Sequence, residues 1–293
     1  MMRILLLGKY GQLGWELQRA LLPLGDVLAL DYPEIDLAKD DFIGTVRSYR
    51  PQVIVNATAY TAVDRAESEA ETATAINARA PGILAEEAAR LSAALIHYST
   101  DYVFDGAKGS DYIETDAPNP LGVYGRSKLG GELAIQQVGG AYLILRTSWV
   151  YSTRRDSFVT KVLQWARQQT VLRVVADQVG NPTWARLLAE ASAQTLAKAG
   201  ADAAAWLGER SGVYHLAGRG RASRLEWAEA ILQLDPRKEE QRVKEIQPAR
   251  SVDFPTPAAR PLHSALNCDK FARTFGLQLP DWREALKLAL GTP

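Results

Sequence analysis

The chain has 293 residues, of which 47% are hydrophobic and 23% charged, as in an ordinary globular protein. Its 34 Lys and Arg residues balance 34 Asp and Glu residues, so the net charge of zero argues against a nucleic-acid partner. The single cysteine, Cys268, excludes an intrachain disulfide and fits a reducing compartment. Apolar runs stay well short of the ~18 residues of a membrane span, and Lys9 ends the N-terminal run before signal-peptide length. We therefore expect a cytoplasmic protein without a membrane partner.

The first 22 residues have the pattern of a dinucleotide-binding unit. An apolar run at 4–7 predicts a buried parallel strand, and 15–22 predicts an amphipathic helix. Between them, Gly8 permits a tight turn, Gly11 lets the backbone approach a pyrophosphate, and Gly14 lets the helix pack close to the sheet. The alternative is a plain strand-to-helix turn. The cofactor contacts expected in this loop, at the helix N-terminus, are Gly8, Lys9, Tyr10, Gly11, Gln12, Leu13 and Gly14.

The second strand, predicted at 26–31, ends in an acid. Asp31 lies where such an acid usually binds the adenosine ribose, so it would accept from the 2′-hydroxyl of NAD and repel the 2′-phosphate of NADP. Lys9 can offset that repulsion, which leaves both NADH and NADPH open. Asp36 and Leu37 open the next loop, where Leu37 can pack on the adenine.

The third and fourth strands are predicted at 52–56 and 94–98. Asn56 is either a cofactor neighbour or a structural hydrogen-bonding residue, and His97 is expected to be a core histidine. Thr100 follows the fourth strand and either binds the reacting oxygen or caps the next turn. Small residues after the third strand leave room for the cofactor, and the contacts expected from both strands are Ala57, Ala59, Tyr60, Thr61 and Tyr98.

Tyr124 and Lys128 stand four residues apart where a helix is predicted to begin, so their side chains emerge on one face. A phenol has a pKa of about 10 and is protonated at neutral pH, ready to give its proton to an alkoxide. A nicotinamide would supply the hydride. Lys128 would stabilise the resulting phenolate, lower the pKa of the phenol and bind the nicotinamide ribose, while Thr100 would hold the carbonyl oxygen.

Up to a strand at 142–146 the pattern is βαβαβαβαβ, which predicts an α/β fold with a doubly wound parallel Rossmann sheet. We expect residues 1–175 to form the dinucleotide-binding domain and residues 176–293 a smaller, interleaved C-terminal α/β substrate-binding lobe. The proline-rich segment 250–265 suits a loop that covers the substrate. Helices are also predicted at 39–49 and, through an Ala/Glu-rich region, from 63 to about 92. Beyond residue 150 the predicted elements are helices at 157–169, 184–198, 223–232 and 282–290, strands at 172–175 and 212–216, and a polar loop at 177–183. The helix at 223–232 is expected to begin with a capping box of Ser223 and Glu226.

Six segments resemble the extended short-chain dehydrogenase/reductase family and, within it, the dTDP-4-dehydrorhamnose reductases; they are 8–14, 56–64, 99–104, 124–128, 146–151 and 260–261. The resemblance implies reduction of the 4-keto group of dTDP-4-dehydro-L-rhamnose by NADPH or NADH, with the product used for cell-surface polysaccharide. It implies that Tyr124 is the proton donor and that Lys128 and Thr100 assist. The substrate contacts it implies are Thr100, Asp101, Val103, Tyr124, Trp149 and Arg260, and Tyr124 and Lys128 also touch the cofactor.

The chain departs from the family pattern at Thr58, usually Ala, and at Tyr60, usually His. Some members dimerise through Mg²⁺ held by acids of the first helix and the C-terminus. Glu16 matches the first of these, but the tail 290–293 has no acidic side chain, which argues against the metal and leaves monomer and homodimer open. Two other functions remain, a different NAD(P)-dependent sugar-nucleotide epimerase or ketoreductase and a non-catalytic regulatory subunit. The intact glycine loop and Tyr124 argue against the regulatory subunit.

Overall fold

The computed structural model describes residues 1–39, 41–200 and 202–291. Within these ranges six strands form one parallel sheet in the order β10-β5-β4-β3-β1-β2. The predicted parallel Rossmann sheet is confirmed. Its strands are β1 (Met2–Leu7), β2 (Gly25–Leu30), β3 (Val53–Asn56), β4 (Ala94–Thr100), β5 (Tyr142–Thr147) and β10 (Gly212–His215).

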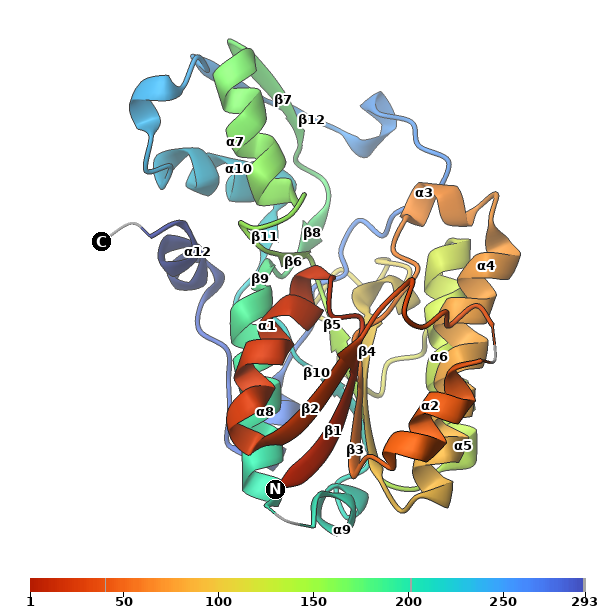
Figure 1. Cartoon of the computed structure of the whole chain (residues 1–293). Helices are drawn as coiled ribbons and strands as arrows, with labels where there is room; N and C mark the ends of the chain where they lie inside the picture. The colour runs from red at the N-terminus through yellow and green to blue at the C-terminus, as the bar shows by residue number, and fades with distance from the viewer. Residues whose placement is uncertain (40, 201, 292–293) are drawn as a thin grey trace.

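Helices cover both faces of the sheet, which explains why its central strands are buried along their length and mostly apolar. Successive residues of β1 point to opposite faces, so Ile4 enters one core and Leu5 the other. Figure 1 shows α1 and α8 on one side of the sheet and α2, α5 and α6 on the other. Their bounds are α1 (Gln12–Leu21), α8 (Ala185–Ala199), α2 (Phe42–Tyr49), α5 (Ala80–Arg90) and α6 (Val123–Val138).

A third core lies above the carboxyl ends of the strands and forms the lobe at the top of Figure 1. Trp227 and Trp282 are its largest buried side chains. The predicted capping box of Ser223 and Glu226 is confirmed at the start of its helix α10. The lobe contains β6 (Val150–Tyr151), α7 (Phe158–Gln168), β7 (Val171–Val175), β8 (Val179–Gly180), β9 (Thr183–Trp184), β11 (Ala222–Ser223), α10 (Arg224–Gln233), β12 (Glu245–Ala249) and α12 (Trp282–Leu290).

Sheet and lobe are interleaved along the chain. β7 lies before residue 176 but pairs with β12 in the lobe. Conversely, α8 and β10 lie after residue 175 but pack on α1 and pair with β5. The domain boundary between residues 175 and 176 stays a prediction. We propose instead to assign each element to the sheet domain or to the lobe according to the elements on which it packs.

Several local elements differ from the prediction. The helical region expected over 63–92 is divided into α3 (Val63–Ala66), α4 (Ala70–Thr74), a π-helical segment (Ala75–Arg79) and α5. The loop expected at 177–183 contains β8 and β9. The helix expected at 39–49 begins at Phe42, and residue 40 lies outside the described residues. Two helices, α9 (Ala203–Gly208) and α11 (Asp269–Phe275), and strand β12 were not predicted. None of the helices in the described part of the chain has the length and apolarity needed to cross a membrane.

Candidate active site

A cavity of about 1050 Å³ opens at the carboxyl ends of the parallel strands, between the sheet and the lobe. This is the place where open α/β sheets usually bind ligands. One end is lined by Gly8 and Ala57 from the strand ends of the sheet, and the other by Phe158 and Trp227 of the lobe. The cavity is therefore built by two parts of the molecule with separate cores.

The glycine loop forms the floor of the dinucleotide end. Gly8 adopts a φ of +92°, and a Cβ added there would lie 2.8 Å from the Ala57 carbonyl carbon. Gly11 is the N-cap of α1, so unpaired N–H groups of the first helical turn face the cavity. Gln12 and Leu13 also line the cavity. A backbone cradle of this kind fits the pyrophosphate of a dinucleotide, as predicted from the spacing of the glycines.

At the expected adenosine end, Asp31 lines the cavity and accepts hydrogen bonds from the backbone N–H groups of Tyr10 and Tyr32, both at 2.8 Å. Lys9 was expected to offset the charge of Asp31. Its ammonium group instead lies 2.6 Å from the carboxylate of Glu34, a residue to which no sequence pattern points. That contact raises the pKa of Lys9 and lowers the pKa of Glu34. The positive charge of Lys9 is therefore already balanced by the carboxylate of Glu34.

The loop after β3 divides into residues that face the cavity and residues that do not. Ala57, Ala59 and Thr61 line it, together with Asp36 and Leu37 from the preceding loop. Tyr60 points away, because its phenol donates a 2.5 Å hydrogen bond to Glu69. The described lining residues do not include Lys9, Tyr10, Gly14 or Tyr60, so the structure does not bring these expected cofactor contacts to the cavity wall.

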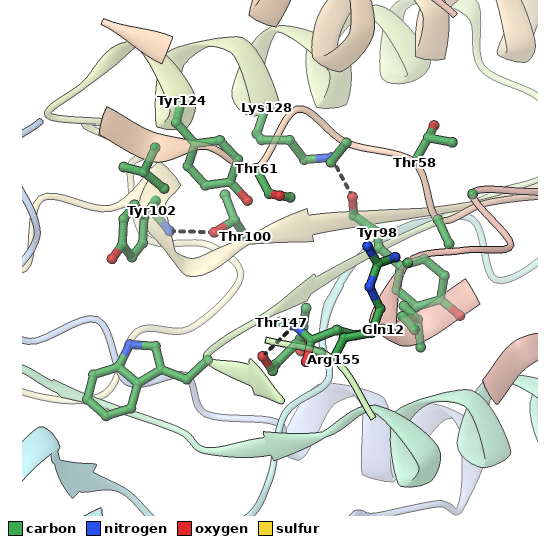
Figure 2. Close-up of a pocket in the computed structure, with 18 of the residues that line it drawn as sticks. Gln12, Thr58, Thr61, Tyr98, Thr100, Tyr102, Tyr124, Lys128, Thr147 and Arg155 are labelled. Carbon is green, nitrogen blue, oxygen red and sulfur yellow. Dashed lines mark hydrogen bonds between the residues drawn. The ribbon is translucent and has the colours of Figure 1, made fainter. Parts of the chain in front are cut away.

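Tyr124 and Lys128 lie one turn apart at the start of α6 and face Thr100 at the end of β4 (Figure 2). Burial raises the pKa of the Tyr124 phenol, and its hydrogen bond with Thr100 opposes that rise. Lys128 was expected to lower this pKa. Instead its amine donates to the Tyr98 carbonyl oxygen at 2.6 Å and lies 3.1 Å from Nε2 of His97. The phenol is consequently protonated at neutral pH, the form that a proton donor needs.

Asp101 lies beside this group and is buried in the cavity wall. Its carboxylate accepts hydrogen bonds from the hydroxyls of Thr100, Ser148 and Ser264. Burial nevertheless dominates and raises the pKa of Asp101 to about 6. By contrast Val103, an expected substrate contact two residues on, is fully buried in a separate cluster with Phe104 and is absent from the described cavity wall.

The end of the cavity next to the lobe has an aromatic and cationic wall. Trp149 stacks on Trp227 with ring centroids 5.6 Å apart. The guanidinium of Arg224 lies 3.6 Å from the centroid of the Trp149 ring on which it stacks. Arg260 pairs with Asp64 at 2.8 Å and also lines the cavity. Trp149 and Arg260 were expected here, whereas Arg224 was missed, because the Ser223 cap marks where α10 begins but not which way its first side chain points.

Room for Trp149 depends on a glycine in the lobe. A Cβ at Gly180 would lie 2.6 Å from Cε2 of Trp149. Trp149 itself has a φ of +44°, a backbone conformation that is uncommon for a bulky residue. Strain of this kind is typical of functional sites.

Glu16, which matches the first-helix acid of the family members that bind Mg²⁺, pairs with Arg186 at 3.3 Å. The described residues contain no cluster of three or more His, Cys, Asp or Glu side chains placed to hold a metal ion. Residues 292 and 293 of the tail lie outside the described residues.

A family model described as the RmlD substrate binding domain matches residues 2–292. The chain is 43% identical to a dTDP-4-dehydrorhamnose reductase of Burkholderia thailandensis, over 99% of this chain and 98% of that protein. It is likewise 43% identical to the protein of that name from Escherichia coli K12, over 99% of this chain and 97% of the relative.

Solved structures agree with these matches. A dTDP-4-dehydrorhamnose reductase of Clostridium acetobutylicum superposes with a TM-score of 0.90 at 32% identity, over 99% of both chains. The Bacillus anthracis protein of that name, in complex with NADP, gives a TM-score of 0.87 at 31% identity, over 100% of this chain and 99% of that one. A UDP-glucose 4-epimerase of Thermus thermophilus, in complex with NAD, gives 0.79 at 21% identity over 99% and 98% of the two chains, a likeness of fold alone.

Proposed function

The chain belongs to the dTDP-4-dehydrorhamnose reductase family, and from that premise we propose how its residues reduce the 4-keto group of dTDP-4-dehydro-L-rhamnose to dTDP-L-rhamnose. It is an NAD(P)H-dependent oxidoreductase of dTDP-rhamnose biosynthesis. The observation that carries the residue assignment is the convergence of Tyr124, Thr100 and Lys128 beside the glycine loop in one cavity. Supply of rhamnose to a cell-surface polysaccharide is the corresponding proposed role.

Tyr124 is the proposed proton donor. A bound nicotinamide supplies hydride to the carbonyl carbon. Thr100 holds the carbonyl oxygen, and the phenol of Tyr124 gives its proton to that oxygen as negative charge develops there. The phenolate left behind needs a cation, and the Lys128 ammonium, one helical turn away, is the group placed to balance it.

The adenosine end favours NADH as the proposed cofactor. The Asp31 carboxylate occupies the position that accepts a ribose 2′-hydroxyl and repels a 2′-phosphate. The nearby cation that would attract this phosphate, Lys9, is held by Glu34. NADPH is expected to be used less efficiently.

The lobe supplies the proposed sugar-nucleotide contacts. Arg224 and Arg260 bring two guanidinium groups to the wall, which suits the diphosphate of a dTDP-sugar. Trp149 offers a flat apolar face, and Asp101 a buried acceptor, for the sugar. Monomer and homodimer both remain proposals for the assembly.

The test of this mechanism is the Tyr124→Phe variant, assayed with a dTDP-4-keto sugar and NADH by loss of nicotinamide absorbance. Loss of the phenolic proton is expected to lower kcat by at least ~10²-fold. NADH affinity, measured by fluorescence titration, is expected to change little because the ring remains.

Tyr102→Phe is the matched control. Its ring lies 5.8 Å from that of Tyr124 and lines the same cavity. The Tyr102→Phe variant also loses one phenolic hydroxyl, and its kcat is expected to stay within a few-fold of the wild-type value. Near-wild-type kcat in Tyr124→Phe, or equal losses in the two variants, would contradict the assignment.

A further inference from the structure

Behind Lys128 lies a row of buried polar side chains that the mechanism above does not use. Nζ of Lys128 is 3.1 Å from Nε2 of His97, and Nδ1 of His97 is 3.1 Å from Nδ2 of Asn56. Lys128 is 1% exposed, and His97 and Asn56 are 0% exposed. A buried row of this kind must satisfy its hydrogen bonds internally, so the direction of each bond can be derived.

The hydrogen bonds of Asn56 determine which atoms of this row donate and which accept. The backbone N–H of Thr58 donates to Oδ1 of Asn56 at 3.1 Å, and a backbone N–H cannot accept. The Asn56 oxygen therefore faces Thr58, and its NH₂ group faces His97. Since that NH₂ group only donates, Nδ1 of His97 must be the acceptor, and a neutral imidazole then carries its proton on Nε2. Burial and the nearby Lys128 hold the pKa of His97 well below its ordinary value, so the ring is neutral.

The proton on Nε2 of His97 points at the Lys128 amine. An ammonium group has donors only, so the charged form would set N–H against N–H. A neutral amine satisfies both neighbours, because it donates to the Tyr98 carbonyl oxygen and accepts from His97.

The surroundings of Lys128 have opposing effects on its pKa. On α6, Tyr124 is uncharged when protonated, and Glu132 favours the cation although it is paired with Arg146 of β5 at 2.6 Å. On β4, His97 is the neutral neighbour. Burial outweighs Glu132 and lowers the pKa of Lys128 to about 8. The N–H from His97 acts in the same direction as burial.

We propose that His97, oriented by Asn56, is a positioning residue that presents an N–H to Lys128 and biases this lysine toward the neutral amine. The proposal rests on the proposed function, in which the cationic form of Lys128 balances the Tyr124 phenolate. Charging Lys128 then requires His97 to carry its proton on Nδ1 and the Asn56 amide to turn over, at the expense of the bond from Thr58. Lys128 is charged below its pKa and neutral above it, so kcat falls as the pH rises through this value.

The decisive variant is Asn56→Asp, which is nearly isosteric. A carboxylate accepts from Thr58 as before, but it also accepts from Nδ1 of His97, which moves the imidazole proton to Nδ1. Nε2 then accepts from Lys128 and favours the ammonium form. The alkaline limb of the kcat–pH profile is expected to move up by roughly one pH unit or more.

A second pair of variants separates this tautomer effect from the field of the new carboxylate. In a His97→Leu background, adding Asn56→Asp is expected to leave the alkaline limb nearly where His97→Leu alone puts it. The proposal would be overturned if Asn56→Asp moved the alkaline limb equally with His97 and with Leu at position 97. It would also be overturned if Asn56→Asp alone left the limb unmoved.

A measurement on the unmodified chain needs no turnover and therefore separates failure of this proposal from failure of the proposed function. The sequence has three histidines. Long-range ¹H–¹⁵N NMR of the ¹⁵N-labelled chain, with the His97 signal identified by its loss in His97→Gln, reports which ring nitrogen bears the proton. Well above the Lys128 pKa of about 8, where the amine is neutral, a protonated Nε2 with a bare Nδ1 is expected, and a proton on Nδ1 there would refute the derivation.

Discussion

At the scale of single residues, the carboxylate of Asp31 and the pairing of Lys9 together determine the charge at the proposed site of the adenosine ribose. Asp31 is fixed by the N–H groups of Tyr10 and Tyr32, so it cannot turn away from a 2′-phosphate without losing two hydrogen bonds. Lys9 lies next to this position but is paired with Glu34. In the proposed binding mode, cofactor preference therefore depends on Glu34 as well as on the acid at the strand end.

Glu34→Gln is expected to improve the use of NADPH. The substitution releases the charge of Lys9, which can then attract the 2′-phosphate, and kcat/KM for NADPH should rise by about three- to fivefold, as for an exposed ion pair. kcat/KM for NADH serves as the internal control and should stay nearly constant, since NADH has no phosphate there. Wild-type protein that prefers NADPH, or a variant that improves both cofactors equally, would contradict the assignment of Glu34.

Among single residues, spacing within one segment predicted the site better than orientation did. Tyr124 and Lys128 were found because helical spacing alone puts them on one face. Tyr60 and Val103 lie beside true lining residues in sequence, yet a bond to Glu69 and a separate core direct them elsewhere. Arg224 has no sequence signal, because its role arises only when α10 packs against Trp149.

At the scale of elements, the closeness of α1 to β1 determines the shape of the dinucleotide end. A Cβ at Gly14 would lie 1.8 Å from the carbonyl oxygen of Gly8 and 2.6 Å from its carbonyl carbon. Both atoms belong to the backbone, so no side chain can move aside. The helix would have to separate from the strand.

Gly14→Ala is therefore expected to destabilise the fold by about 3 kcal/mol or more. Gly44→Ala is the matched control, because Gly44 lies in α2 and its added Cβ meets nothing within 4 Å. Removing a helical glycine there should stabilise the protein by about 0.5–1 kcal/mol. Urea unfolding of both variants measures the difference, and a change of the same sign in the two would show that contact with Gly8 is not the cause.

The strands of the sheet were predictable because burial on both faces makes them continuous apolar runs. β12 was not, since its sequence Glu-Ile-Gln-Pro-Ala includes a proline and mixes polar with apolar residues at the edge of a two-stranded pair. The breaks between 63 and 92 were also hidden, because this Ala/Glu-rich segment has helical character throughout, and the π-helical segment meets its partner α6 only in the folded structure.

At the scale of the whole molecule, Asp101 joins the parts that form the cavity. It follows β4, and its carboxylate accepts from Ser148, after β5, at 3.0 Å and from Ser264, in the distant C-terminal part of the chain, at 2.5 Å. Burial raises the pKa of Asp101 from its ordinary value of 3.8 to about 6. Because the folded state binds this proton more tightly than the unfolded chain does, the contribution of Asp101 to stability is fully present below about pH 4 and is lost as the pH rises through 6.

Asp101→Asn should abolish this pH dependence. A shift from 3.8 to about 6 corresponds to about 3 kcal/mol of unfolding free energy in full, of which about 2.4 kcal/mol is lost between pH 4 and pH 7.5, so the variant should gain that smaller amount relative to wild type over this range. The amide retains one acceptor and adds a donor, so its absolute stability at either pH depends on how the hydroxyls of Ser148 and Ser264 reorient. The difference between the two pH values does not depend on this rearrangement, because serine hydroxyls do not titrate in that range. Chemical unfolding of both proteins at the two pH values gives that difference directly, and a stability gap that is the same at pH 4 and pH 7.5 would show that Asp101 ionises in the folded protein as easily as in the unfolded chain.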